Sequence, residues 1–317
     1  MDIMKNRKFS IPYNGSVAKD YFIIINPYIK NIDHIYFGLP SLLDTHPRFK
    51  DKDTAEKNTL DFLSYDIPIK RFLTLNKAHY WKSDKEIYSF CNELVFPILA
   101  RYHIEGVIIS DYTMARYIHH YMPHLILSTS CNTFTYNTHS MQLWNSECGV
   151  SLFNPPRDTL RTPALLKEIH KTGFKLKCIV NESCRYGCTQ QMTHCFCGSN
   201  IHGHMSLKCQ NLDEIDILKC NWILPRWLKY LDEYVDIFKI VGRGASTKQI
   251  VSMLDAYINE RDDIYLDDFI YGGVYRGCHL NLPTSIIPDK LLTCECKYCK
   301  DCKLCEKVIN QYKNNIS

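Results

Sequence analysis

The strongest constraint on the fold of this 317-residue chain is an alternation of short apolar runs with helical patterns along nearly its whole length. Such alternation is typical of βαβ units, in which helices join parallel strands. The sequence predicts eight strands, at 32–37, 70–75, 106–110, 125–130, 149–153, 175–180, 221–224 and 236–241. It predicts amphipathic helices between them, at 84–102, 112–121, 138–147, 163–172, 225–234 and 246–260.

Eight strands with interleaved helices favour an α/β fold of the (β/α)8 TIM-like barrel type, with a doubly wound sheet as the alternative. The chain length and the 45% hydrophobic content suit one large core. The pattern is lost from Cys278 onward, so we expect a barrel domain at 1–277 and a short cysteine-rich appendage at 278–317. Residues 45–68 are expected to form a polar excursion over the barrel surface.

Charge and hydropathy exclude some classes of protein. The formal charge of +4 does not by itself indicate a polyanionic partner. The first ten residues hold no apolar segment of the kind found in signal peptides, and no stretch approaches the roughly 18 apolar residues of a membrane span. The sequence therefore predicts a soluble cytoplasmic protein without a membrane span.

The 16 cysteines are unusual for such a protein, because cytosolic thiols are kept reduced. Metal ligation is the leading explanation. Cys91, Cys131, Cys148 and Cys178 lie singly within apolar segments and are expected to be core residues.

One cysteine-rich stretch, VNESCRYGCTQQMTHCFC at 180–197, directly follows the predicted sixth strand. Active sites of (β/α)8 barrels lie at the carboxyl ends of the strands, so its thiols should face the catalytic side. Four thiolates from two neighbouring loops could bind an iron-sulfur cluster, although zinc or unliganded structural cysteines are alternatives. The candidate ligands are Cys184, Cys188 and Cys220 with one of Cys195, Cys197 and Cys209, of which Cys195 is the working choice.

A second constellation, TCECKYCKDCKLCEK at 293–307, repeats the C-x2-C spacing of ferredoxin-type clusters but lacks the usual proline after the last ligand. A zinc site that pins the carboxyl terminus is the alternative. The candidate ligands are Cys294, Cys296, Cys299, Cys302 and Cys305.

Other polar residues also follow predicted strands. Arg243 ends the eighth strand in DIFKIVGR and could clamp a carboxylate or phosphate, and Arg226 could join it. The plainer interpretation is that one of the two arginines pairs with Glu182 or Asp111, the remaining candidate catalytic residues. The sequence contains no G-x-G-x-x-G after its first predicted strand, no P-loop, no H-E-x-x-H and no G-x-S-x-G.

Four segments, taken together, resemble the collagenase-like peptidase family U32: VIISDYTMARYIHHYMP, LSTSCNTFTYN, VNESCRYGC and CNWILPRWLKYLDEYVDIFKIVGR, in this order between residues 107 and 243. The resemblance implies a TIM-barrel-like domain and, as in several branches, a [4Fe-4S] cluster. Cys184, Cys188 and Cys220 match the family's cluster cysteines best. Arg243 matches the arginine of the family's terminal motif, with Val241 where many members carry glutamate. The long carboxyl-terminal domains of larger members are replaced by the cysteine-rich tail.

The resemblance also implies a function. Branches of the family hydroxylate the ubiquinone precursor ring or RNA bases without oxygen, so we expect an iron-sulfur-dependent hydroxylase-like enzyme acting on a small aromatic molecule or an RNA base. An electron donor or a homologous partner subunit is an expected partner. The alternatives are a peptidase and a metal-stabilised RNA-binding protein.

Overall fold

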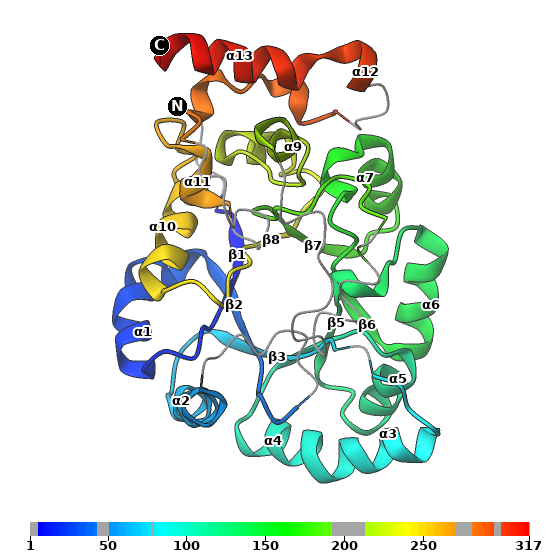
Figure 1. Ribbon diagram of the computed structural model, residues 1–317. Coiled ribbons are helices and arrows are strands. Elements are labelled where there is room, and N and C mark those ends of the chain that lie inside the picture. The colour runs from blue at the N-terminus through cyan, green and yellow to red at the C-terminus, as the bar shows by residue number, and fades with distance from the viewer. Residues whose placement is uncertain are drawn as a thin grey trace.

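The computed structural model describes residues 6–42, 51–77, 79–189, 191, 213–270, 281–294 and 299–316. Its centre is a closed barrel of parallel strands in chain order, in which β8 pairs with β1 (Figure 1). The strands are β1 (Lys8–Pro12), β2 (Ile32–Phe37), β3 (Lys70–Leu75), β4 (Gly106–Ile109), β5 (Ile126–Thr129), β6 (Val150–Phe153), β7 (Lys175–Ile179) and β8 (Ile237–Lys239). The (β/α)8 barrel that the sequence predicts is confirmed.

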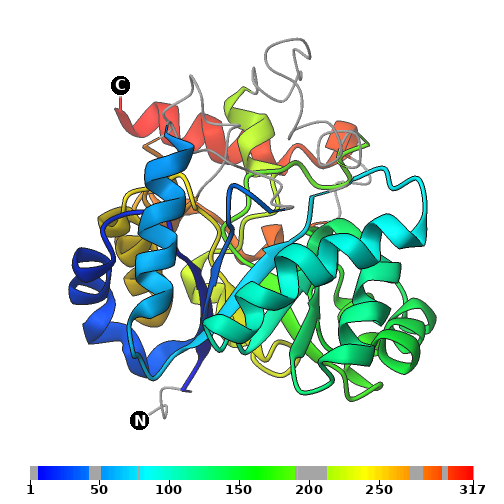
Figure 2. The same ribbon diagram turned by 90° about the horizontal axis from the view of Figure 1, so that it is seen from below.

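Helices surround the strands on all sides (Figures 1 and 2). Several begin where the sequence supplies a capping side chain, such as Asn137 before α6 and the Ser246–Gln249 capping box at α10. The outer helices of the barrel are α1 (Ala18–Ile25), α2 (Lys52–Ser64), α3 (Asp84–Phe90), α4 (Phe96–Arg101), α5 (Tyr112–Tyr121), α6 (Thr138–Cys148), α7 (Pro163–His170), α9 (Glu214–Leu218), α10 (Thr247–Ile258) and α11 (Leu266–Phe269).

The core has two parts, because successive side chains of a strand point to opposite faces. The outward faces of the strands pack beneath the helices in one continuous cluster. A smaller cluster of Tyr36, Phe72, Ile108, Leu152 and Ile237 fills part of the barrel interior. Gly106 admits the Phe72 ring to this interior, since a Cβ at residue 106 would lie 2.6 Å from the ring.

One predicted strand is wrong, and one observed strand was not predicted. Residues 221–224 are not a strand of the barrel, and the missing strand is β1 near the amino terminus. The apolar run NWIL instead lies against the segment that follows β7, where the Ile223 amide donates to the Val180 carbonyl at 2.8 Å. β1 escapes prediction because its sequence, KFSIP, is short and places the polar Ser10 among its buried residues.

The predicted polar excursion at 45–68 is also wrong over residues 52–64, which form α2. Asp51 caps this helix by accepting hydrogen bonds from the amides of Asp53 and Thr54. Only four α2 residues are buried, Ala55, Thr59, Phe62 and Leu63, so the apolar stripe is narrow and its helical period is weak in the sequence.

The tail packs against one side of the barrel. It contains a 3-10 turn, η9 (Asp289–Leu291), and the helices α12 (Cys299–Cys302) and α13 (Leu304–Ile316). α13 lies beside α9, outside the ring of strands (Figure 1), and Lys313 forms an ion pair of 2.6 Å with Glu214 of α9. In the parts of the chain that the structure describes, no helix combines the length and hydrophobicity that crossing a bilayer requires.

Candidate functional site at the barrel mouth

Two lysines project from the last strands into the barrel. Lys177 of β7 is fully buried, with its Nζ 5.4 Å from the centre of the Phe72 ring, and Lys239 of β8 is 6% exposed, with its Nζ 4.4 Å from the centre of the Tyr36 ring. Burial lowers the pKa of Lys239 to about 8, helped by the charges of Arg243 and Arg157. Burial and the nearby Lys239 hold the pKa of Lys177 well below its ordinary value.

Two arginines and one carboxylate surround Lys239 at the carboxyl ends of the strands. Arg157 donates from Nε to Glu182 at 2.7 Å, and both side chains are about nine-tenths buried. Burial acts to raise the pKa of Glu182, but the charge of Arg157 and hydrogen bonds from Arg157 and Cys184 hold it below its usual value. Arg243 lies 6.0 Å from the Tyr36 ring centre and donates to the Thr74 hydroxyl at 3.3 Å. Glu182 is therefore an ionised carboxylate among cations.

A chain of hydrogen bonds lies deeper in the barrel. The Ser10 hydroxyl and His34 Nε2 are 2.7 Å apart, and His34 Nδ1 is 2.7 Å from a carboxylate oxygen of Asp33. Burial and the charge of Lys177 lower the pKa of His34 to about 3, so its imidazole is neutral at pH 7. The order resembles a serine–histidine–aspartate triad. Ser10 and His34 are both fully buried, however, so no peptide reaches this serine in the observed conformation.

Two of the predicted cluster cysteines, Cys184 and Cys220, lie beside Glu182. Residues 185 and 220 form an antiparallel bridge, and the Asn221 amide donates to the Cys184 carbonyl at 2.8 Å, so the backbones of Cys184 and Cys220 are neighbours. Cys188 follows on the same loop. Cys195, Cys197 and Cys209 lie outside the described residues. Within the described ranges, no three His, Cys, Asp or Glu side chains are arranged as a metal site.

The tail cysteines come together elsewhere. Cys294, Cys299, Cys302 and Cys305 line one pocket with Ile215 and Lys219 of the α9 region. Cys296 lies outside the described residues. Burial raises the pKa of the Cys305 thiol to about 11, with the neighbouring Cys294 as a further cause.

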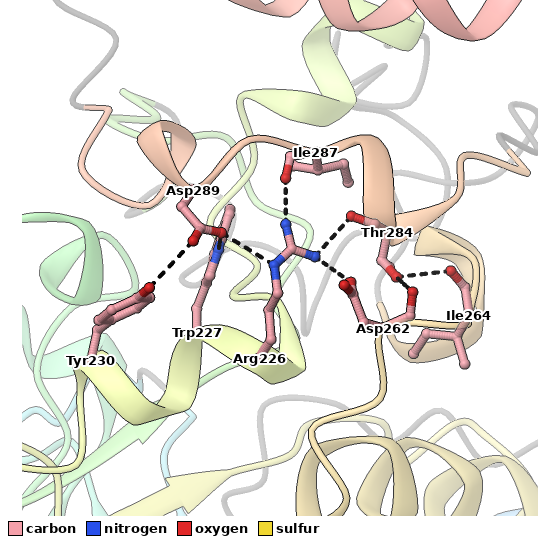
Figure 3. A network of polar contacts seen from close by, with 8 residues as sticks. All are labelled: Arg226, Trp227, Tyr230, Asp262, Ile264, Thr284, Ile287 and Asp289. Carbon is pink, nitrogen blue, oxygen red and sulfur yellow. Dashed lines mark hydrogen bonds and ion pairs between the residues drawn. The ribbon is translucent and has the colours of Figure 1, made fainter.

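Arg226 lies apart from this mouth. Figure 3 shows its guanidinium between Asp262 and Asp289, where it also donates to the carbonyls of Thr284 and Ile287. Trp227 strengthens the same contact by donating to Asp289 at 2.6 Å. These contacts give Arg226 the role of tethering η6 (Pro225–Tyr230) to Asp262 and to the first part of the tail.

Asp111 has a structural role as well. It is the N-cap of α5, where it accepts from the Met114 amide at 2.8 Å, and it also accepts from Trp81 Nε1 at 3.1 Å. Of the four candidate catalytic residues, Glu182 and Arg243 lie close to Lys239, whereas the contacts of Asp111 and Arg226 stabilise the scaffold.

Several residues of the mouth were missed by sequence reasoning. Lys177 and Lys239 could have been found as lysines at inward positions of otherwise apolar strands, KLKCI and IFK. Arg157 follows β6 in NPPRD, and only the fold brings it to Glu182. His34 carries no sequence signal beyond its place in β2.

Comparison with known proteins agrees with this fold. The sequence model of peptidase family U32 matches residues 28–212. A protein of Methanocaldococcus jannaschii, named as an uncharacterized protease, is 34% identical over 158 residues, which are 45% of this chain and 46% of that protein. The match thus spans about half the length of that relative. The solved structure of the U32 peptidase Mk0906 has a TM-score of 0.54 at 8% identity and covers 74% of this chain and 93% of its own, a likeness of fold.

Proposed function

The chain belongs to peptidase family U32, and from this premise we propose that its barrel mouth binds an anionic small molecule and modifies it by oxygen-independent hydroxylation or a related redox reaction. The observation that supports this proposal is the charge around Lys239. Two guanidiniums, Arg157 and Arg243, act on it, together with the single carboxylate of Glu182. The positive charges repel one another strongly, because the site is buried and the local dielectric constant is low. An anion that enters the mouth relieves this repulsion, and we therefore expect it to bind strongly.

The protonation states of the mouth residues suggest a different role for each of them. Arg243 is held by Thr74 and faces Tyr36, so it can clamp a carboxylate of the substrate. Lys239, with a pKa near 8, can gain or lose a proton close to neutral pH and suits general acid–base work. Glu182 stays ionised and holds Arg157 in place.

A [4Fe-4S] cluster is part of the proposal. Thiolates are its usual ligands. Cys184 and Cys220 lie in neighbouring segments beside Glu182, Cys188 follows on the loop of Cys184, and the fourth ligand is expected among Cys195, Cys197 and Cys209. When bound, the cluster would supply electrons or a Lewis-acidic iron. Its electrons would come from a donor protein or a homologous partner subunit. An RNA base is the alternative to a small-molecule substrate.

The first test is metal analysis of protein purified without oxygen. The proposal expects iron and acid-labile sulfide in the wild type and, in Cys184→Ser, loss of the iron and sulfide of one cluster. Cys148→Ser is the matched control: Cys148 is buried at the end of α6, directly before β6 begins, so it lies at the opposite end of the strands from the mouth and its replacement should leave the metal content unchanged. Absence of iron and sulfide from anaerobic wild-type protein would contradict the proposed cluster.

A peptidase is the second candidate, and the Ser10–His34–Asp33 hydrogen bonds are what favours it. Incubation with a mixed peptide library distinguishes the two functions. Cleavage that is abolished in Ser10→Ala would establish a peptidase, whereas the proposal expects no cleavage by either protein.

A further inference from the structure

We propose that Cys294, Cys299, Cys302 and Cys305 bind a second metal centre, either one zinc ion or one iron-sulfur cluster, which fastens the tail to α9 and to the segment directly before Cys220. The four thiols line one pocket with Ile215 and Lys219. Four thiolates are the donor set that both kinds of centre prefer.

The local chain geometry suits such a site. Cys299 and Cys302 stand three residues apart on α12, so their side chains lie on one face of that helix. Cys305 follows at the start of α13. Cys294 reaches the pocket from the turn after η9. Among the side chains described, these thiols do not already converge as a metal site. Rotation of a cysteine about its single χ1 bond moves the sulfur between three wells, and we expect the metal to select the converging ones.

The surroundings balance the charge that a metal centre would bring. Binding of one zinc ion by four thiols releases four protons to solvent and leaves a net charge of −2. Lys219 and Lys303 line the same pocket, and Lys219 and Arg161 act on the Cys305 thiol. Glu306 also lines the pocket, so three cations and one carboxylate surround a centre with a net charge of −2.

The position of the pocket connects it to the barrel mouth. Lys219 immediately precedes Cys220, and its carbonyl accepts from the Tyr186 amide at 2.9 Å, within the loop that carries Cys184 and Cys188. The buried Arg161 donates to the Cys220 carbonyl and to the Leu291 carbonyl, each at 2.7 Å. The tail is thus attached to Cys220 on two sides, and a metal in the pocket would make that attachment firm.

The experiment measures zinc, iron and acid-labile sulfide in the full chain purified without oxygen, for the wild type, Cys302→Ser and Asp301→Asn. Cys302 is exposed, so its replacement should leave the barrel folded, and Asp301 is a matched control on the same helix outside the pocket lining. We expect Cys302→Ser to lose about one zinc, or the iron and sulfide of one cluster, while Asp301→Asn loses none. Zinc loss identifies a zinc ion, and joint loss of iron and sulfide identifies a cluster.

A second variant separates this site from the barrel cysteines. Cys184→Ser should keep the metal that Cys302→Ser loses. If Cys302→Ser and the wild type contain the same zinc, iron and sulfide, or if Cys184→Ser alone removes all metal, the tail site does not exist. Neither outcome depends on the anion site of the barrel mouth.

Discussion

The barrel mouth and the tail pocket gather reactive side chains in opposite ways. At the mouth, Arg157, Glu182 and Arg243 stand at strand ends of a closed barrel, and each is held by a charged or polar neighbour. In the pocket, the thiols come from a turn and two helices that pack on α9. The mouth is therefore ordered by the protein itself, whereas in our proposal a metal draws the four sulfur atoms of the pocket together.

The largest expected effect is a loss of stability when the ion pair of the barrel mouth is broken. Glu182→Gln should lower the free energy of unfolding by about 3–5 kcal/mol, because it leaves the buried Arg157 without its counter-charge beside Lys239. Chemical denaturation at pH 7 measures the loss. Arg157→Met is the matched variant and should lower the free energy of unfolding by less, because Glu182 still has the positive charge of Lys239 nearby. Equal losses in the two variants would show that the mouth carries no excess of positive charge.

The second effect concerns the connection between the two regions. Arg161→Met removes the two hydrogen bonds to the carbonyls of Cys220 and Leu291, both buried, and should cost about 2–4 kcal/mol in unfolding free energy. Limited proteolysis should then release the tail first. Arg261→Met is the control, because its ion pair with Asp263 is exposed and touches no tail residue, and it should change neither the stability nor the release of the tail noticeably. A tail that resists protease equally in Arg161→Met and the wild type would contradict this connection.

The third effect is a dependence of stability on pH. Lys239→Met should raise the free energy of unfolding at pH 7 by about 1–3 kcal/mol, because it removes a buried amine whose folded-state pKa, about 8, is below that of the unfolded chain. Between pH 8 and about 10.5 the unfolded chain binds more protons than the folded one, so the stability of the wild type rises with pH. The advantage of the variant is therefore full below pH 8 and shrinks above it. Thermal denaturation from pH 7 to pH 10 measures both proteins, and an advantage that stays constant across this range would exclude a lowered pKa.

The smallest effect tests a residue that sequence reasoning placed in catalysis. Asp111→Ala should cost about 1 kcal/mol through loss of the α5 cap, and Asp111→Ser should restore most of it. Urea titration of the three proteins gives these values. If Asp111→Ser were as unstable as Asp111→Ala, the contact with Trp81 rather than the cap would be the important one.

The sequence allowed the barrel to be predicted because most of its strands are apolar runs separated by helical periods. Prediction failed where that pattern was weak or misleading. The polar Ser10 in β1 points toward His34, so this strand does not read as an apolar run. The run NWIL is apolar because it is buried against the segment after β7, although it pairs with no barrel strand.

The site was harder to predict than the fold. Glu182 and Arg243 could be chosen because they follow predicted strands, and strand ends meet at one face of a barrel. Arg157 could not be chosen in this way, because its contact with Glu182 joins segments 25 residues apart in sequence. Arg226 also follows an apolar run, but that run is not a strand, so the same rule misplaced it. Cys195, Cys197, Cys209 and Cys296 stay predictions, since they lie outside the described residues.

The sharpest test of an anion site in the barrel mouth is isothermal titration of the anaerobic protein with aromatic mono-, di- and tricarboxylates. At least one member should bind once per chain, with an affinity about 10- to 100-fold lower in Lys239→Met and Arg243→Met and unchanged in Lys171→Met, whose side chain is 70% exposed. Raising the salt concentration should weaken binding to the wild type more than to either mouth variant. If no carboxylate distinguishes the wild type from the two mouth variants, the barrel mouth is not an anion-binding site.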